Sequence, residues 1–151
     1  MAAHLDLDLV RRIGAANQGL AIVAVARPDG RIHASLVNAG VLDDPVTGEP
    51  VVGAVFRGDA HKLRYVRRAG RATMVFQNGW EWVSVEGRTV VAGPDDELAG
   101  FDPARRPDLL RDVFRAAGGV HDDWAEYDRV MAAERRAVVL LRPARVTTNR
   151  R

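Results

Sequence analysis

Apolar residues recur at helical spacing at the start of the chain and then give way to continuous apolar runs. Between Leu5 and Ala16 they lie three or four positions apart, which predicts a first amphipathic helix. Residues 20–39 contain two apolar runs around a polar turn. Pro28 presets the backbone for a reversal there, and Gly30 accepts the positive φ that the reversal needs. This pattern predicts a β-hairpin, with strands over 20–26 and 32–39.

The rest of the chain alternates short apolar strands with amphipathic segments of helical period. Further strands are expected over residues 51–56, 72–77, 80–92 and 137–141, and further helices over residues 60–69, 108–117 and 123–133.

Several residues mark where these elements should begin, turn or bend. Asp59 is expected to cap the helix over residues 60–69, and Gly70 to end it. The pair Asn78-Gly79 is the strongest short hairpin signal in the chain. Pro143 should bend the last strand or mark a sheet edge, because proline cannot donate to a strand ladder.

The order of elements is therefore a helix, three strands, a short helix, two strands, two helices and one strand. Strands joined mainly by hairpins exclude a doubly wound sheet, which needs helical crossovers between parallel strands. We expect a mainly β protein, a six-stranded antiparallel barrel with peripheral helices. Its 151 residues suffice for a single domain over 1–151.

Composition narrows the possible functions. No apolar run approaches the ~20 residues of a membrane span, and the N-terminus lacks a secretory signal, so a cytoplasmic protein is expected. Cysteine is absent, which excludes thiol nucleophiles and zinc fingers, and the four histidines have no metal-ligand spacing. The net charge is only +2, and the arginine-rich composition is interpreted as compositional bias, not as a nucleic-acid-binding signal.

The helix over residues 60–69 carries the most informative charges. Arg64, Arg67 and Arg68 share one face, whereas Lys62, the one lysine of the chain, falls on the packing side. A buried ammonium needs a partner, and the first turn of a helix favours an anion. Two interpretations stay open for Lys62: it binds a phosphate, or it reaches solvent or pairs with Asp59. The arginines likewise form either a binding surface or a solvated face.

No catalytic constellation is recognisable. The sequence has no GxGxxG, no GxxxxGK[ST] and no GxSxG motif, so a bound cofactor would have to carry any chemistry and the catalytic residues stay unidentified. Phe76, Trp80 and Trp82 flank the Asn78-Gly79 turn. They could stack on a planar ring, cover a dimer interface or belong to the core.

Four segments in sequence order resemble a known family. They are the hairpin over 20–35, the segment 61–72 (HKLRYVRRAGRA, similar to K-x-R-N-L-R-R-D-P-R), the segment 79–87 (GWEWVSVEG, ending in W-x-x-x-x-E-G) and the segment 121–128 (HDDWAEYD). The chain resembles the pyridoxamine-5′-phosphate-oxidase-like FMN-binding split barrels, and among them the F420-dependent branch of actinobacteria. It departs from the pattern at Tyr65-Val66 and at Ala69-Gly70, which leaves the lysine and the arginines in place.

The resemblance implies a homodimer with two cofactor clefts between the subunits. In it, Lys62 with the preceding Phe56 and Arg57 would contact the cofactor phosphate, and the strand of His33, Ser35 and Val37 would lie along the ring edge. The full set of expected cofactor-binding residues is His33, Ser35, Val37, Val55, Phe56, Arg57, His61, Lys62, Arg67, Arg68 and Trp80.

The function that follows is hydride transfer from reduced coenzyme F420 to a small unsaturated organic substrate, with no metal, nucleic acid or membrane involved. The arginines on the helix surface could meet the carboxylate tail of F420. Two alternatives stay open: an FMN-dependent oxidoreductase of the same fold, and a non-catalytic protein that binds or senses a cofactor or haem.

Overall fold

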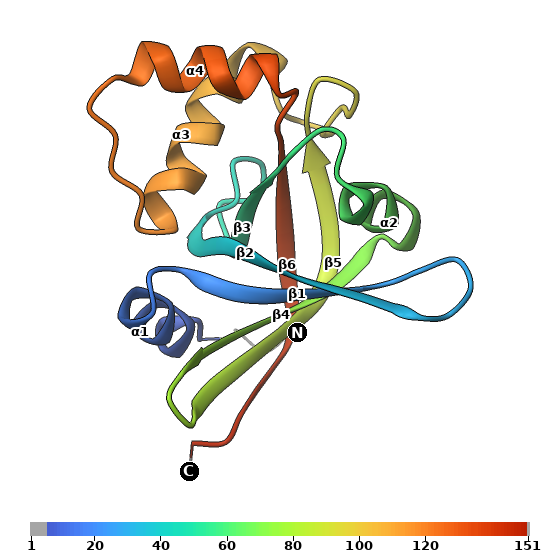
Figure 1. Cartoon of the computed structure of the whole chain (residues 1–151), viewed down its shortest axis with the longest axis vertical. Helices are drawn as coiled ribbons and strands as arrows, with labels where there is room; N and C mark the ends of the chain where they lie inside the picture. The colour runs from blue at the N-terminus through green and yellow to red at the C-terminus, as the bar shows by residue number, and fades with distance from the viewer. Residues whose placement is uncertain (1–5, 151) are drawn as a thin grey trace.

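Residues 6–150 are described by a computed structural model, in which six antiparallel strands close into a β-barrel with four α-helices around it (Figure 1). The strands neighbour one another in the order β1-β2-β3-β6-β5-β4, so the predicted six-stranded antiparallel barrel is confirmed. The elements are α1 (Asp8–Ala16), β1 (Leu20–Ala26), β2 (Ile32–Asp43), β3 (Pro50–Phe56), α2 (His61–Ala69), β4 (Arg71–Asn78), β5 (Glu81–Ala92), a 3-10 turn (Pro103–Arg105), α3 (Arg106–Ala116), α4 (Trp124–Ala133) and β6 (Ala137–Thr148).

The barrel interior is filled by side chains that alternate along the strands. Val23 of β1, Phe76 of β4 and Val85 of β5 are fully buried, whereas their chain neighbours face outward. α1 and α2 pack against this barrel at different places, and α3 and α4 lie together at one end (Figure 1).

A second apolar cluster lies outside the barrel, beneath α3 and α4. Leu110 and Val113 of α3 and Tyr127 of α4 pack on Val138 and Leu140 of β6. Since β6 also sends residues into the barrel, Ala137 to Leu141 are all buried. This explains why that stretch is a continuous apolar run.

Two boundary predictions were wrong. Asp59 does not cap α2: the N-cap is Ala60, without a side-chain hydrogen bond, and the Asp59 carboxylate accepts a hydrogen bond from Arg57 Nε at 3.3 Å. Asp59 lies one residue before the N-cap, and its carboxylate pairs with the neighbouring Arg57 guanidinium instead of the backbone of α2. α1 begins at Asp8, and Leu5 lies outside the described residues.

The prediction for Pro143 is confirmed, although the last strand is longer than expected. β6 runs without interruption through Pro143, which lies opposite Gly87 where the β5–β6 register shifts. β6 pairs with β3 only as far as Leu141, so Pro143 lies at an open edge of the strand as well as at this bulge, and both accommodate the missing N–H. Gly87 is required there because a Cβ would lie 1.9 Å from the carbonyl oxygen of Arg142.

One buried ion pair ties the β2–β3 turn to β6. Asp44 is 2% exposed and accepts hydrogen bonds from Arg142 Nε at 2.8 Å and from the backbone N–H of Val46 at 2.8 Å and Thr47 at 3.1 Å. Burial alone would raise the pKa of Asp44, but these hydrogen bonds outweigh it and hold the pKa below its usual value.

Among residues 6–150, no helix is long and apolar enough to cross a membrane. In the same part of the chain, no group of three or more metal-ligating side chains is found. The cytoplasmic location stays a prediction.

Candidate functional site

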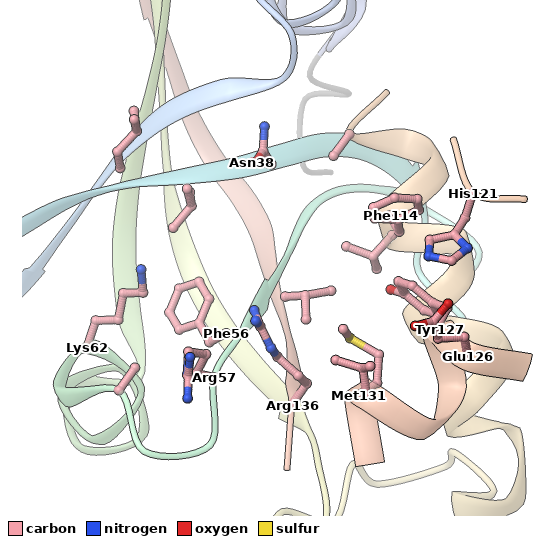
Figure 2. A pocket seen from close by; sticks show the side chains of 17 residues that line it. Asn38, Phe56, Arg57, Lys62, Phe114, His121, Glu126, Tyr127, Met131 and Arg136 are labelled. Carbon is pink, nitrogen blue, oxygen red and sulfur yellow. The ribbon is translucent and has the colours of Figure 1, made fainter. Parts of the chain in front are cut away.

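A cavity of about 590 Å³ lies between the barrel and the C-terminal helices (Figure 2). β2, β3 and α2 form one side of it, and α3, α4 and the residue before β6 form the other. Its volume falls within the range of about 300–1,000 Å³ that is usual for small-molecule and cofactor sites. Its two ends differ in chemistry.

One end is cationic. Arg57 follows β3, Lys62 lies in the first turn of α2, and Arg136 immediately precedes β6 (Figure 2). These segments meet because Gly58 packs directly on Arg135. A Cβ at position 58 would lie only 2.5 Å from the Arg135 carbonyl oxygen, and the Gly58 N–H donates to the Glu134 carbonyl oxygen at 3.2 Å.

Lys62 has no anionic partner among the described residues. Its Nζ lies 5.0 Å from the centroid of the Phe56 ring, and no carboxylate within residues 6–150 comes within ion-pair distance. Burial, and secondly the positive charge of Arg136, lower the pKa of Lys62. The interpretation that Lys62 pairs with Asp59 is therefore wrong, because Asp59 pairs with Arg57. An anion bound here would restore the pKa of Lys62.

The two arginines are paired with carboxylates. Arg57 lies 3.3 Å from Asp59 and 3.3 Å from Glu134, and Arg136 lies 3.1 Å from the same Glu134 carboxylate. Three cations thus face two carboxylates, and the surplus positive charge is that of Lys62. The pairs also hold both guanidinium groups in position.

The other end of the cavity is aromatic. Phe114 of α3, Tyr127 of α4 and His121 of the loop between them line it, together with Met131 (Figure 2). The centroid of the Phe114 ring lies 5.0 Å from that of Tyr127 and 6.3 Å from that of His121. These side chains form a wall suited to a planar ring.

Five of the predicted cofactor-binding residues line the cavity: Val37, Val55, Phe56, Arg57 and Lys62. The other six lie elsewhere: His33, Ser35, His61, Arg67, Arg68 and Trp80.

Two of those six, His33 and Ser35, lie on β2 before Leu36, the first residue of this strand that lines the cavity. The His33 ring lies 5.4 Å from that of Tyr65, and Ser35 Oγ is buried without a hydrogen-bond partner in the described part of the chain. Trp80 lies at the tip of the β4–β5 turn and is 94% exposed, whereas Phe76 is buried in the barrel. The aromatic residues around this turn therefore form no common cluster.

The arginine face of α2 is divided. Arg67 binds Asp96 through hydrogen bonds of 2.8 Å from Nε and 2.6 Å from a terminal nitrogen. Arg64 lies 3.2 Å from His61 Nδ1. Arg68 is exposed. Arg67 thus ties α2 to the loop after β5, on a different side of the helix from the cavity, and its role in cofactor binding stays a prediction.

Arg136 and the aromatic wall escaped the sequence analysis. Arg136 follows a helix and precedes an apolar strand, where an arginine carries no distinctive pattern. The segment containing His121 was noted for its resemblance, yet spacing alone could not place it beside Phe114.

Comparisons with solved structures identify the type of barrel. A conserved hypothetical protein of Mycobacterium tuberculosis matches with a TM-score of 0.68 at 17% identity, over 95% of this chain and 84% of that one. A pyridoxamine 5′-phosphate oxidase-related, FMN-binding protein of Nostoc punctiforme matches with a TM-score of 0.65 at 15% identity, over 98% and 86%. An F420 reductase matches with a TM-score of 0.55 at 14% identity, over 85% and 88%. The fold is an FMN-binding-type split barrel.

At these identities the split-barrel likeness concerns the fold alone. Neither a protein-family model nor a curated protein matches the sequence. What the cavity binds must therefore be argued from its own residues.

Proposed function

We propose that this split barrel is an oxidoreductase that holds a flavin-type cofactor by its phosphate, with F420 favoured over FMN. The observation that carries the proposal is the unpaired Lys62 beside Arg57 and Arg136, at one end of a cavity of about 590 Å³. A half-buried ammonium without a carboxylate is costly unless an anion joins it.

The residues present fit such a cofactor. Lys62 and the two guanidinium groups would bind the phosphate, with the first turn of α2 adding its backbone dipole. The apolar middle and the aromatic end would take the ring and exclude water. When bound, reduced F420 supplies a hydride, here to a small unsaturated organic substrate.

The preference for F420 is supported by the resemblance of segment 61–72 to the F420-dependent branch. The fold does not separate the two cofactors, because it is shared with an F420 reductase and with an FMN-binding protein. Arg68 stays available for the carboxylate tail, but Arg67 contributes little because Asp96 already holds it.

The proposal includes a homodimer whose second subunit completes the cleft. Ile22 of β1 lies opposite Leu36 of β2 on the outer barrel face, and these side chains are 43% and 58% exposed. Ile32 on the same face is 62% exposed. Soluble monomers rarely leave such contiguous apolar surface in water. Leu36 also lines the cavity, so a subunit covering this face would reach the cofactor.

Fluorescence titration of FMN and F420 tests the proposal. Lys62→Ala should weaken the binding of both cofactors by roughly 1.5–3 kcal/mol, the range for a hydrogen bond to a charged group. Arg31→Ala is the matched control, since it removes an exposed cation of the β1–β2 turn and should change neither affinity. Equal affinities of Lys62→Ala and wild type would contradict the phosphate site, and a wild type that prefers FMN would contradict the choice of F420.

A further inference from the structure

His121 is held in one orientation by the loop that carries it. The backbone N–H of Asp123 donates to His121 Nδ1 at 3.0 Å. The Asp122 carboxylate lies at 4.0 Å from the same nitrogen and is fully exposed, so the backbone bond is the one that orients the ring. Because Nδ1 accepts this hydrogen bond, the ring proton of neutral His121 lies on Nε2.

Aromatic rings surround the imidazole and fix its plane. Its centroid lies 5.8 Å from that of Trp124 and 5.7 Å from that of Tyr127. Trp124 is in turn covered by the guanidinium of Arg115, 4.4 Å from its centroid. His121 is thus preorganised, and its side chain keeps 28% exposure at the cavity wall.

The other polar groups near His121 are already occupied or cannot donate. The Tyr127 hydroxyl donates to the Leu110 carbonyl oxygen at 2.9 Å, and burial raises the pKa of Tyr127 to about 12. Asn38 lies on β2 across the cavity from His121, and one of its two amide N–H groups donates to the Gln18 carbonyl oxygen at 2.9 Å. Glu126, when ionised, only accepts. Among residues 6–150, no group accepts a hydrogen bond from His121 Nε2–H. This atom is also not one of the buried polar atoms that lack a partner, so a ligand can reach it.

We propose that His121 donates this Nε2–H to a carbonyl oxygen of a planar ring bound against Phe114 and Tyr127. Figure 2 shows these three side chains together at the end of the cavity away from Lys62. The ring belongs either to the cofactor or to a second molecule, since both chemistries offer a planar carbonyl acceptor. The inference depends on the aromatic end alone, and it holds whether or not Lys62 binds a phosphate.

A pair of probes of similar shape isolates the hydrogen bond. Menadione carries ring carbonyls and 2-methylnaphthalene does not, and the binding of each is measured by ligand-detected NMR titration. The wild type should prefer menadione. His121→Phe keeps an aromatic ring without a donor, so it should weaken menadione binding about 2- to 12-fold, the effect of one neutral hydrogen bond. The same variant should bind 2-methylnaphthalene with an affinity within twofold of that of the wild type. His121→Gln should restore part of the preference for menadione.

A matched control and a cofactor titration complete the test. Val120→Ala changes the neighbouring residue, which is 90% exposed and outside the cavity, and should bind both probes as wild type does. If His121→Phe also weakens FMN several-fold, the carbonyl is that of the cofactor ring; if FMN is unaffected, it is that of a second molecule. A wild type without preference, or a His121→Phe variant that changes both probes equally, would overturn the proposal and leave His121 a packing residue.

Discussion

The contact between Gly58 and Arg135 gives the sharpest stability prediction, because it holds both halves of the cationic end together. Gly58→Ala would place a Cβ 2.5 Å from the Arg135 carbonyl oxygen and 2.8 Å from the Arg135 Cβ. Heavy atoms in contact lie about 3.5 Å apart, so the two segments must separate by roughly 1 Å. Neither neighbour is the end of a flexible side chain, so the backbone has to move.

The magnitude follows from three effects. Overpacking costs about 1–3 kcal/mol, and weakening the Gly58 hydrogen bond to the Glu134 carbonyl oxygen adds about 0.5–1.5 kcal/mol. The stiffer unfolded chain returns about 0.4–1 kcal/mol. The net loss is about 0.5–4 kcal/mol, which for a chain of this size lowers Tm by roughly 1–16 °C. The separation also moves Arg57 and Lys62 away from Arg136, so FMN affinity should fall as well.

Thermal unfolding followed by circular dichroism measures the Tm of each variant, and the FMN titration measures its affinity for the cofactor. Gly14→Ala is the matched control: its Cβ would meet the Phe76 ring at 3.4 Å, an ordinary contact, inside α1. There alanine improves helix propensity and should raise stability by up to about 1 kcal/mol. Should Gly58→Ala melt with the wild type, the close packing of the two segments would be refuted.

Two further predictions concern the buried ion pair and the outer face. Asp44→Asn should cost about 1.5–3 kcal/mol at pH 7, because it weakens the charged hydrogen bonds to Arg142. The folded pKa of Asp44 is depressed, so its contribution is complete above the unfolded pKa and is lost as pH falls through the folded one. Urea unfolding should therefore show variant and wild type converging in acid, and a difference independent of pH would contradict this. Ile22→Glu should dissociate the proposed homodimer in light scattering, and a wild type with monomer mass would disprove the assembly.

Periodicity and turn residues together were enough to order the elements along the chain and to identify the buried sides of α2 and β5. Apolar residues two apart identify the inward face of β5, and residues three or four apart identify the packing side of α2. Lys62 could be placed on that packing side for the same reason, since helical geometry is local. The barrel followed because hairpins and the absence of crossovers leave few alternatives.

Only the tertiary structure determines which charged residues that are distant in the sequence pair with one another. The loop after β5 brings Asp96 to Arg67, and the carboxylate of Asp59, which was expected to cap α2, pairs with Arg57. Arg136 joined Lys62 because β6 closes the barrel beside β3 and Gly58 lets the two loops touch. A charge pattern along the chain specifies where each side chain can point. Which opposite charge it meets, and which cation is left unpaired, depends on how the whole barrel closes.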